Sequence, residues 1–302
     1  MDRRRFIETS ILGLGAMAAS PRRVTADAPK ASFPTQPRAR LSVASYPFRK
    51  DLDPTKGTLP LLDFPKMVAD RYGLAGIEPL DKHFPTTDAA YLAKLRATLD
   101  KLEMHVVNIP VGVHASFYDP DPARRALAVS GAKRWVDVAV ALASPSIRTH
   151  IEGKKGTKPD AVLAAKSLRE VAEYGATKGV VIHLENDDPE TEDAFFVVDV
   201  ITRAGHPWLR ALPDFCNSML LNKGEGYNDK ALKAMFEHAH GISHVKDSEV
   251  DGKTLYRVDV KKAFAIAKAA GYRGYFSMEW EGATEPYAGT QSLIDASLEA
   301  LA

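Results

Sequence analysis

Four side chains that could do chemistry follow apolar runs in the C-terminal half of the chain. The runs read GVVIHLEND, LRALPDFCN, ISHVKDS and GYFSMEWEG, and they carry Glu185, Asp214, His244 and Glu279. A carboxylate at the end of a buried strand costs free energy unless an amide, an arginine or a metal ion pairs with it. Three converging carboxylates repel one another, and a divalent cation removes the repulsion. One imidazole with three carboxylates suits Mn²⁺, with Mg²⁺, Fe²⁺, Co²⁺ or Zn²⁺ as alternatives.

Each of these side chains also has a structural interpretation when it is taken alone. Asp214 or Asp187 could cap the helix that follows it, and His244 could be a buried histidine whose hydrogen bonds are satisfied. The joint pattern is harder to explain in this way, because it recurs on four consecutive apolar runs. We therefore predict a single metal site built from these four runs.

Short apolar runs alternate with amphipathic helical stretches from Arg40 onward. Helical patterns cover residues 87–103, 121–142, 161–178 and 259–272. The spacing is 29 residues from Glu185 to Asp214, 30 to His244 and 35 to Glu279. One βα unit of a barrel takes about 30 residues. Repeated strand–helix units of this length predict an α/β fold, a single (β/α)8 TIM barrel, with the four side chains at the carboxyl ends of its strands.

The N-terminal half supplies the remaining strands of the predicted barrel. Their polar end residues are Tyr46, Glu78, Asn108 and His150. The 42 residues between Asn108 and His150 leave room for a long loop around residues 111–122. A doubly wound open sheet is the competing architecture, but no glycine-rich phosphate turn follows the first apolar run.

The composition argues against nucleic-acid binding and excludes an internal disulfide. Lys+Arg 40 against Asp+Glu 39 leaves a net charge of +1, so the chain has no basic field to hold a nucleic acid. The single cysteine, Cys216, excludes an internal disulfide.

The N-terminus resembles an export signal. Three arginines at positions 3–5 precede Phe6 and Ile7, and a short run of small and apolar residues follows. That run is too short to span a bilayer, and Ala26-Asp27-Ala28 fits an A-x-A cleavage site. The arginine pair predicts the twin-arginine export machinery as a partner and a periplasmic or secreted mature protein without a stable membrane span. An amphipathic cap or a disordered tail is the alternative. We expect a signal peptide over residues 1–28, a linker over 29–39 and the barrel over 40–302.

The motifs HLEND, LPDFCN, SHVKD and FSMEWEG resemble the sugar phosphate isomerase/epimerase superfamily, the xylose isomerase-like TIM barrels. The resemblance covers essentially all of residues 40–302. It implies that Glu185, Asp214, His244 and Glu279 hold one divalent metal ion, most often manganese. It also implies that Glu185 and Glu279 are the catalytic acid/base pair, on opposite faces of a carbohydrate substrate.

Strand parity and position add further candidates around this set. Lys246 has the parity of His244, and it could stabilise a developing enolate or form an ion pair with Asp247 or Glu249. His183 and Glu281 could orient the ligands from one layer away. The residues expected to face substrate hydroxyls are Lys246, Arg148, His150, Glu78 and Asn217.

The resemblance favours a metal-dependent sugar isomerase or epimerase that removes a proton beside a polarised carbonyl. Ketose epimerases of the family carry a second histidine three residues after the metal aspartate, and this chain has Asn217 there, which argues against a free-ketose C3-epimerase. A lyase that eliminates from 3-keto-glycosides is the runner-up. A non-catalytic periplasmic sugar-binding barrel is the third reading. The related zinc endonucleases need more histidines than this chain offers.

Overall fold

The computed structural model describes residues 27–30, 32–153, 157–188, 191–224, 226–282 and 285–302. The predicted signal peptide therefore lies almost entirely outside the described residues. Among the described residues, no helix is long and apolar enough to cross a membrane.

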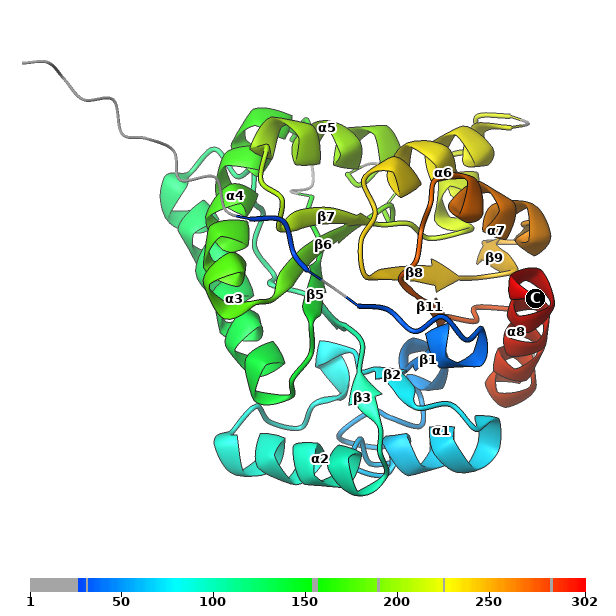
Figure 1. Cartoon of the computed structure of the whole chain (residues 1–302). Coiled ribbons are helices and arrows are strands. Elements are labelled where there is room, and N and C mark those ends of the chain that lie inside the picture. Colours follow the sequence, from blue (N-terminus) through cyan, green and yellow to red (C-terminus); the bar gives the residue numbers. More distant parts are fainter. Residues whose placement is uncertain (1–26, 31, 154–156, 189–190, 225, 283–284) are drawn as a thin grey trace, which may run out of the picture.

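Parallel strands form the centre of the molecule (Figure 1). One sheet has the order β3-β2-β1-β11-β8 and the other the order β4-β5-β6-β7. The strands are β1 (Leu41–Ala44), β2 (Gly76–Glu78), β3 (His105–Val106), β4 (Ile109–Val111), β5 (Ser146–Thr149), β6 (Val181–Glu185), β7 (Leu209–Leu212), β8 (Ile242–Val245) and β11 (Tyr275–Met278).

Two junctions join these sheets into a closed ring. Only Val107 and Asn108 separate β3 from β4, so the two act as one barrel strand. Between β7 and β8 the ladder consists of two isolated parallel bridges, Ala211 with Ala239 and Asp214 with His244. The eight-stranded barrel expected from the spacing is confirmed.

The helices surround the ring in the order of the chain. They are α1 (Phe64–Tyr72), α2 (Ala89–Lys101), α3 (Pro122–Ala141), α4 (Ala161–Lys178), α5 (Ala194–Ala204), α6 (Tyr227–Glu237), α7 (Val260–Ala269) and α8 (Pro286–Leu301). The four helical patterns expected from the sequence are found in α2, α3, α4 and α7. Asp160 shows why α4 starts where it does, because its side chain accepts hydrogen bonds from the amides of Val162 and Leu163.

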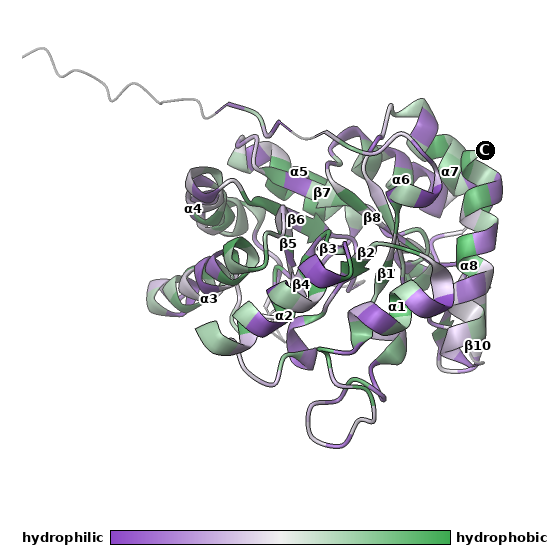
Figure 2. Ribbon diagram, turned by 60° about the horizontal axis from the view of Figure 1, so that its bottom comes forward, coloured by the Kyte–Doolittle hydropathy of each residue, from purple (hydrophilic) through white to green (hydrophobic). Residues whose placement is uncertain are grey.

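The core lies between the strands and the helices. Along β6, Ile182 and Leu184 belong to the main hydrophobic cluster, whereas Glu185 lies among the polar groups of the barrel interior. This alternation follows from the period of two along a strand. Hydrophobic colouring accordingly concentrates on the strands and on the helix faces turned toward them (Figure 2).

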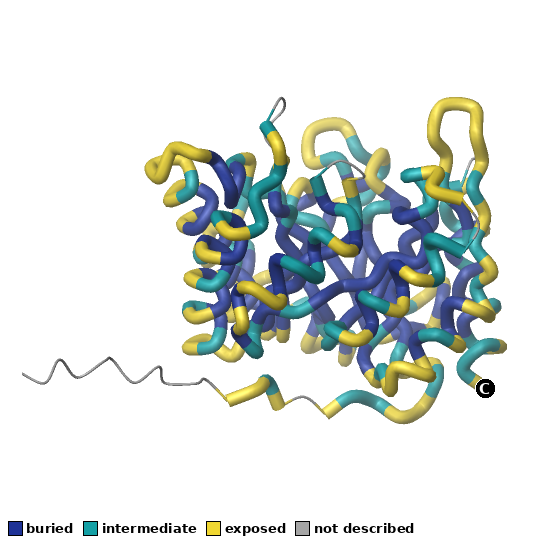
Figure 3. Tube along the Cα trace, turned by 90° about the horizontal axis from the view of Figure 1, so that it is seen from above, coloured by how far each residue is buried: buried dark blue, intermediate teal, exposed yellow. Residues whose placement is uncertain are grey.

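Residues 27–30 and 32–40 run across the amino-terminal mouth of the barrel, and we call them the strap (Figure 3). The Phe33 ring packs edge-on against His240 and Tyr275, with centroids 5.5 and 6.0 Å apart. Trp208 Nε1 donates to the Asp27 carbonyl at 2.7 Å. The segment expected to be a linker is therefore packed against the barrel.

A hairpin of β9 (Ser248–Asp251) and β10 (Thr254–Arg257) is inserted between β8 and α7. It was not expected from the sequence. It accounts for the longer 35-residue interval between His244 and Glu279.

Candidate metal centre

The four predicted ligands come together at the carboxyl ends of adjacent strands. Glu185 ends β6, Asp214 follows β7, His244 lies within β8 and Glu279 follows β11. One ligand atom from each lies within 4.8 Å of the others, and all four residues are buried. Burial makes the electrostatic cost of the three carboxylates large, so a positive charge among them is required.

His244 presents its two ring nitrogens to different partners. Nδ1 lies 2.7 Å from Glu185 Oε1 and 3.1 Å from Glu279 Oε2. Nε2 lies 3.0 and 3.1 Å from the two oxygens of Glu78. Glu78 in turn accepts a hydrogen bond from Asn108 Nδ2 at 2.8 Å. A proton on Nε2 donated to Glu78 leaves Nδ1 as the ligand atom, an arrangement common for metal-binding histidines.

Glu78 therefore lies elsewhere than expected. It was predicted to face substrate hydroxyls, but its side chain is fully buried behind the His244 ring. The contact it makes is with the imidazole, and it does not line the cavity in front of the ligands.

The two carboxylate oxygens of Asp214 have different surroundings. Its Oδ1 accepts hydrogen bonds from the amides of Cys216 and Asn217, at 2.8 and 2.7 Å. Its Oδ2 is buried and accepts no hydrogen bond from any described residue, and Lys246 Nζ lies 3.7 Å away. A buried carboxylate oxygen without a hydrogen-bond donor is what a cation at this position would satisfy, so the residues fit a metal ion.

Lys246 supplies a fixed positive charge beside the ligands. Its Nζ donates to Asn217 Oδ1 at 2.9 Å and to Glu249 at 3.3 Å, and it forms an ion pair with Glu279 at 3.4 Å. Glu281 makes a further short contact with it. Lys246 thus has the ion pair with Glu249 that the structural interpretation required, and it also faces the ligand carboxylates.

Arg148 and His150 approach the centre from β5 and the loop after it. Arg148 Nε forms an ion pair with Glu185 Oε2 at 2.9 Å, and its guanidinium contacts the His150 ring. His150 Nδ1 lies 2.9 Å from Glu192 Oε2 and 3.4 Å from Asp187. Asp187, expected to belong to a loop or helix cap, therefore lies beside the site, while Asp193 caps α5.

His183 does not support the ligands as expected. It is fully buried, and neither ring nitrogen has a hydrogen-bond partner among the described residues. The ring lies against Gly241, which precedes β8, so it belongs to the amino-terminal half of the barrel interior. Burial lowers the pKa of His183 to about 3, and the ring is neutral at physiological pH.

The charges in the centre shift the carboxyl groups in opposite directions. Burial raises the pKa of Glu185 and brings the pKa of Asp214 to about 7, although neighbouring cations oppose both shifts. Burial also acts to raise the pKa of Glu279, but His244 and Lys246 together outweigh it and hold that pKa below its usual range. Burial would lower the pKa of His244, but Glu185, Glu279 and Glu78 raise it well above its usual value.

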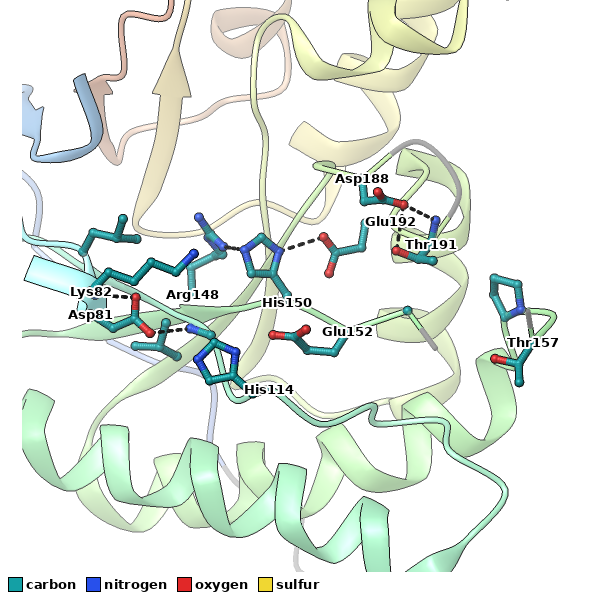
Figure 4. Close-up of a pocket in the computed structure, with 15 residues that line it drawn as sticks. Asp81, Lys82, His114, Arg148, His150, Glu152, Thr157, Asp188, Thr191 and Glu192 are labelled. Carbon is teal, nitrogen blue, oxygen red and sulfur yellow. Dashed lines mark hydrogen bonds and ion pairs between the residues drawn. The ribbon is translucent and has the colours of Figure 1, made fainter. Parts of the chain in front are cut away.

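Two adjacent hollows lie in front of the centre. The inner cavity measures about 110 Å³, and its lining residues include Tyr46, Asp187, Asn217, Lys246 and the two ligand glutamates. The outer chamber measures about 620 Å³ and shares Leu80, Lys82, Arg148 and His150 with the inner cavity. Figure 4 shows the outer chamber with Lys82, His114, Arg148 and Glu152 around it.

Sequence reasoning missed several side chains that line the outer chamber. Asp81 and Lys82 follow β2, while His114, Glu152 and Glu192 lie in the loops after β4, β5 and β6. These residues lie in loops, where side chains do not alternate between two faces, so the argument from strand parity could not identify them. The long loop expected around residues 111–122 was the available sign that this side of the barrel is extended.

Comparison with known proteins agrees with the barrel fold. The sequence model of the xylose isomerase-like TIM barrel matches residues 68–301. The chain belongs to this family. No curated protein sequence matches it.

Solved structures of xylose isomerase-like barrels and sugar epimerases have the same fold. A xylose isomerase-like TIM barrel protein from Mycobacterium smegmatis in complex with magnesium superposes with a TM-score of 0.69, at 16% identity over 88% of this chain and 99% of its own. D-psicose 3-epimerase from Clostridium cellulolyticum H10 with D-tagatose gives 0.70, at 16% identity over 87% and 99%. A 3-keto-D-glucoside 4-epimerase from E. coli gives 0.62, at 15% identity over 85% and 98%.

Proposed function

We propose that this xylose isomerase-like barrel is a divalent-metal-dependent sugar isomerase or epimerase. The observation that carries the proposal is the convergence of two glutamates, an aspartate and a histidine, with both glutamates lining one cavity. The solved relatives named as sugar epimerases support it at the level of fold.

Glu185, Asp214, His244 and Glu279 would hold the ion, and manganese is our proposal for its identity. A bound divalent cation supplies Lewis-acid polarisation of a substrate carbonyl, which acidifies the neighbouring C–H bond. Oxygen-rich ligand sets suit Mn²⁺ and Mg²⁺ better than they suit softer metals.

In this proposal, Glu185 and Glu279 move the proton. They come from β6 and β11, which β7 and β8 separate in the ring of strands. One carboxylate takes the proton of the C–H bond, whose electron pair moves toward the carbonyl oxygen. Return of a proton to the same carbon from the other face inverts that carbon. Return to the neighbouring carbon isomerises the sugar.

Lys246 and Arg148 would stabilise the charge that develops. Both side chains are buried and line the inner cavity. Burial would lower the pKa of Lys246, but Asp214, Glu279 and Glu281 raise it well above its usual value, so its ammonium acts as a fixed charge and not as a base.

Exchange of substrate C–H hydrogen with deuterium from solvent tests the proposal. The metal-loaded protein should exchange the hydrogen beside the carbonyl, and Glu185→Gln or Glu279→Gln should abolish turnover. Glu170→Gln, on the exposed face of α4, is the matched control. Wild-type rates in both active-site variants would contradict the proposed mechanism.

A lyase acting on 3-keto-glycosides is the second candidate, because a cavity of about 620 Å³ opens beside the centre. The same proton removal would be followed by loss of the group on the β-carbon. Release of an aglycone distinguishes it from an epimerase, and a non-catalytic sugar-binding barrel would show neither exchange nor release.

We also propose export by the twin-arginine route and a periplasmic or secreted location. The arginines at positions 3–5 and the apolar run after them support this proposal. Fractionation of cells that carry the full chain or an Arg3→Lys, Arg4→Lys variant would test it. Equal amounts of both proteins outside the cytoplasm would contradict it.

A further inference from the structure

The outer chamber is far larger than the cavity at the metal centre. The inner cavity measures about 110 Å³, well below the roughly 300–1,000 Å³ usual for small-molecule sites. The outer chamber, at about 620 Å³, falls within that range. The two hollows share Lys82, Arg148 and His150, so they lie side by side.

The charge of the outer chamber disfavours anionic ligands. Its lining carries four carboxylates and two permanent cations, namely Asp81, Glu152, Asp188, Glu192, Lys82 and Arg148. One of the two cations, Arg148, is already paired with Glu185. A phosphate in this chamber would therefore meet an excess of negative charge.

The polar groups of the chamber are held in place by the backbone. Asp81 Oδ2 accepts a hydrogen bond from the Gly112 amide at 2.8 Å. Glu192 binds the Ile151 amide with one oxygen and His150 with the other. Fixed carboxylates and imidazoles, which accept and donate hydrogen bonds, are suited to the hydroxyl groups of a neutral sugar.

Two residues of the lining adopt a backbone conformation that is unusual for their type. His114 and Glu152 have φ values of 54° and 60°. Non-glycine residues in this region carry strain that the surrounding structure must offset, and such residues cluster at ligand sites. Both side chains lie beside Gly112, within 3.7 Å of where its Cβ would be.

We propose that the outer chamber binds a second, uncharged ring joined to the sugar that reacts at Glu185 and Glu279. The substrate is then a neutral glycoside and neither a free nor a phosphorylated monosaccharide. This rests on the proposed function for the placement of the reacting sugar. The selectivity of the chamber itself can be measured without turnover.

Calorimetry of the metal-loaded protein with cellobiose, maltose, glucose and glucose 6-phosphate tests the chamber directly. At least one disaccharide should bind tenfold or more tightly than glucose, and glucose 6-phosphate should bind most weakly. Equal binding of the disaccharides and glucose, or tighter binding of the phosphate, would overturn the proposal.

Gly112→Leu tests whether the advantage of the second ring comes from this chamber. A Cβ at Gly112 would lie 3.4 Å from His114 and 3.6 Å from Asp81, which both line the hollow, so the larger side chain of leucine would take up space in it. The disaccharide advantage should fall at least tenfold. Ala265→Leu, in a separate hollow beside α7, is the control that should leave it unchanged. If Gly112→Leu still binds the disaccharide more tightly than glucose by the same factor, the proposal that this chamber binds the second ring is wrong.

Deuterium exchange separates this proposal from the proposed function. If disaccharides bind preferentially but no sugar exchanges hydrogen, the chamber stands and the isomerase or epimerase fails. If exchange is faster with free ketoses than with the matching keto-glycosides, the catalytic proposal stands and the glycoside proposal fails.

Discussion

At the scale of single residues, the orientation of one histidine determines what the centre can bind. Glu78 fixes the His244 ring through Nε2, at 3.0 and 3.1 Å, and so directs Nδ1 toward the ligand carboxylates. A carboxylate in this position also raises the basicity of the ligand nitrogen. Glu78 would thus contribute to the affinity for the proposed metal ion without lining the cavity.

Glu78→Gln should weaken metal binding by about 10–100-fold, because the amide keeps the shape but lacks the negative charge. Titration of the metal-free protein with Mn²⁺, followed by calorimetry, gives the affinity. Glu170→Gln should leave it unchanged. A variant with unaltered affinity would show that His244 is oriented by the fold alone.

His83 provides a pH dependence of stability that is independent of the metal ligands. Its Nδ1 lies 2.8 Å from Ser45 Oγ, and burial lowers its pKa to about 4. The unfolded chain takes up a proton near pH 6.5, whereas the folded chain does so only near pH 4. The free energy of unfolding should therefore fall by about 3 kcal/mol between those two pH values because of this residue.

Denaturant unfolding of wild type and His83→Gln across pH 4–7.5 would measure this contribution. The advantage of wild type over the variant should shrink steadily as the pH falls through this window. Parallel curves for the two proteins would contradict the assignment to His83.

The sequence could predict the four ligands because strand parity is a local property. Glu185, Asp214, His244 and Glu279 each follow an apolar run, and parallel strands bring their carboxyl ends together. The contact between Glu78 and His244 could not be predicted in the same way. The two residues are 166 positions apart, and they meet only because the barrel closes.

At the scale of elements, Gly175 shows how tightly α4 packs on the barrel. A Cβ at this position would lie 2.4 Å from the Val180 carbonyl oxygen and 3.1 Å from Ile182 Cδ1. Alanine normally stabilises a helix interior relative to glycine. Here the close approach to the backbone at the start of β6 reverses the expectation.

Gly175→Ala should therefore destabilise the protein by about 1–3 kcal/mol, as overpacking does in a filled core. Thr177→Ala, on the exposed side of the same helix, should have little effect or stabilise slightly. Thermal unfolding of both variants gives the comparison. A stabilising Gly175→Ala would mean that α4 can shift away from β6 at low cost.

Element prediction succeeded for the long periodic helices and missed the short β9–β10 hairpin. Gly252 and Lys253 form the two-residue hairpin turn, with Gly252 at a φ of 59°. A two-residue loop that begins with glycine is a usual hairpin turn. Its strands have four residues each and are largely exposed, so no buried apolar run marked them.

At the scale of the whole molecule, the two mouths of the barrel are built differently. The strap covers the amino-terminal mouth through Phe33, and it lies in the part of the chain that was expected to be a linker. The loops at the opposite mouth carry the centre and the outer chamber. The composition of residues 29–39 could not predict that the segment packs on the barrel, because a proline-rich composition is the same in a packed segment and in a free linker.

The way in which the barrel closes links its opening to the retention of an ion. Asp214 and His244 are both predicted ligands and one of the two bridges between β7 and β8. A cation held by both residues would cross-link β7 and β8, which only two isolated bridges pair. Release of the ion and opening of the barrel between these two strands would then be one event.

Hydrogen exchange would show this as a local change. Loading with Mn²⁺ should slow exchange of the His244 and Ala211 amides, which bond across the junction to Pro213 and His238. The Val107 amide, which bonds to Ile77 between β2 and β3, should change little. Equal slowing at all three amides would mean that the ion stabilises the fold as a whole. If only the His244 and Ala211 amides are slowed, the lifetime of the bound ion is set by the rate at which β7 and β8 separate.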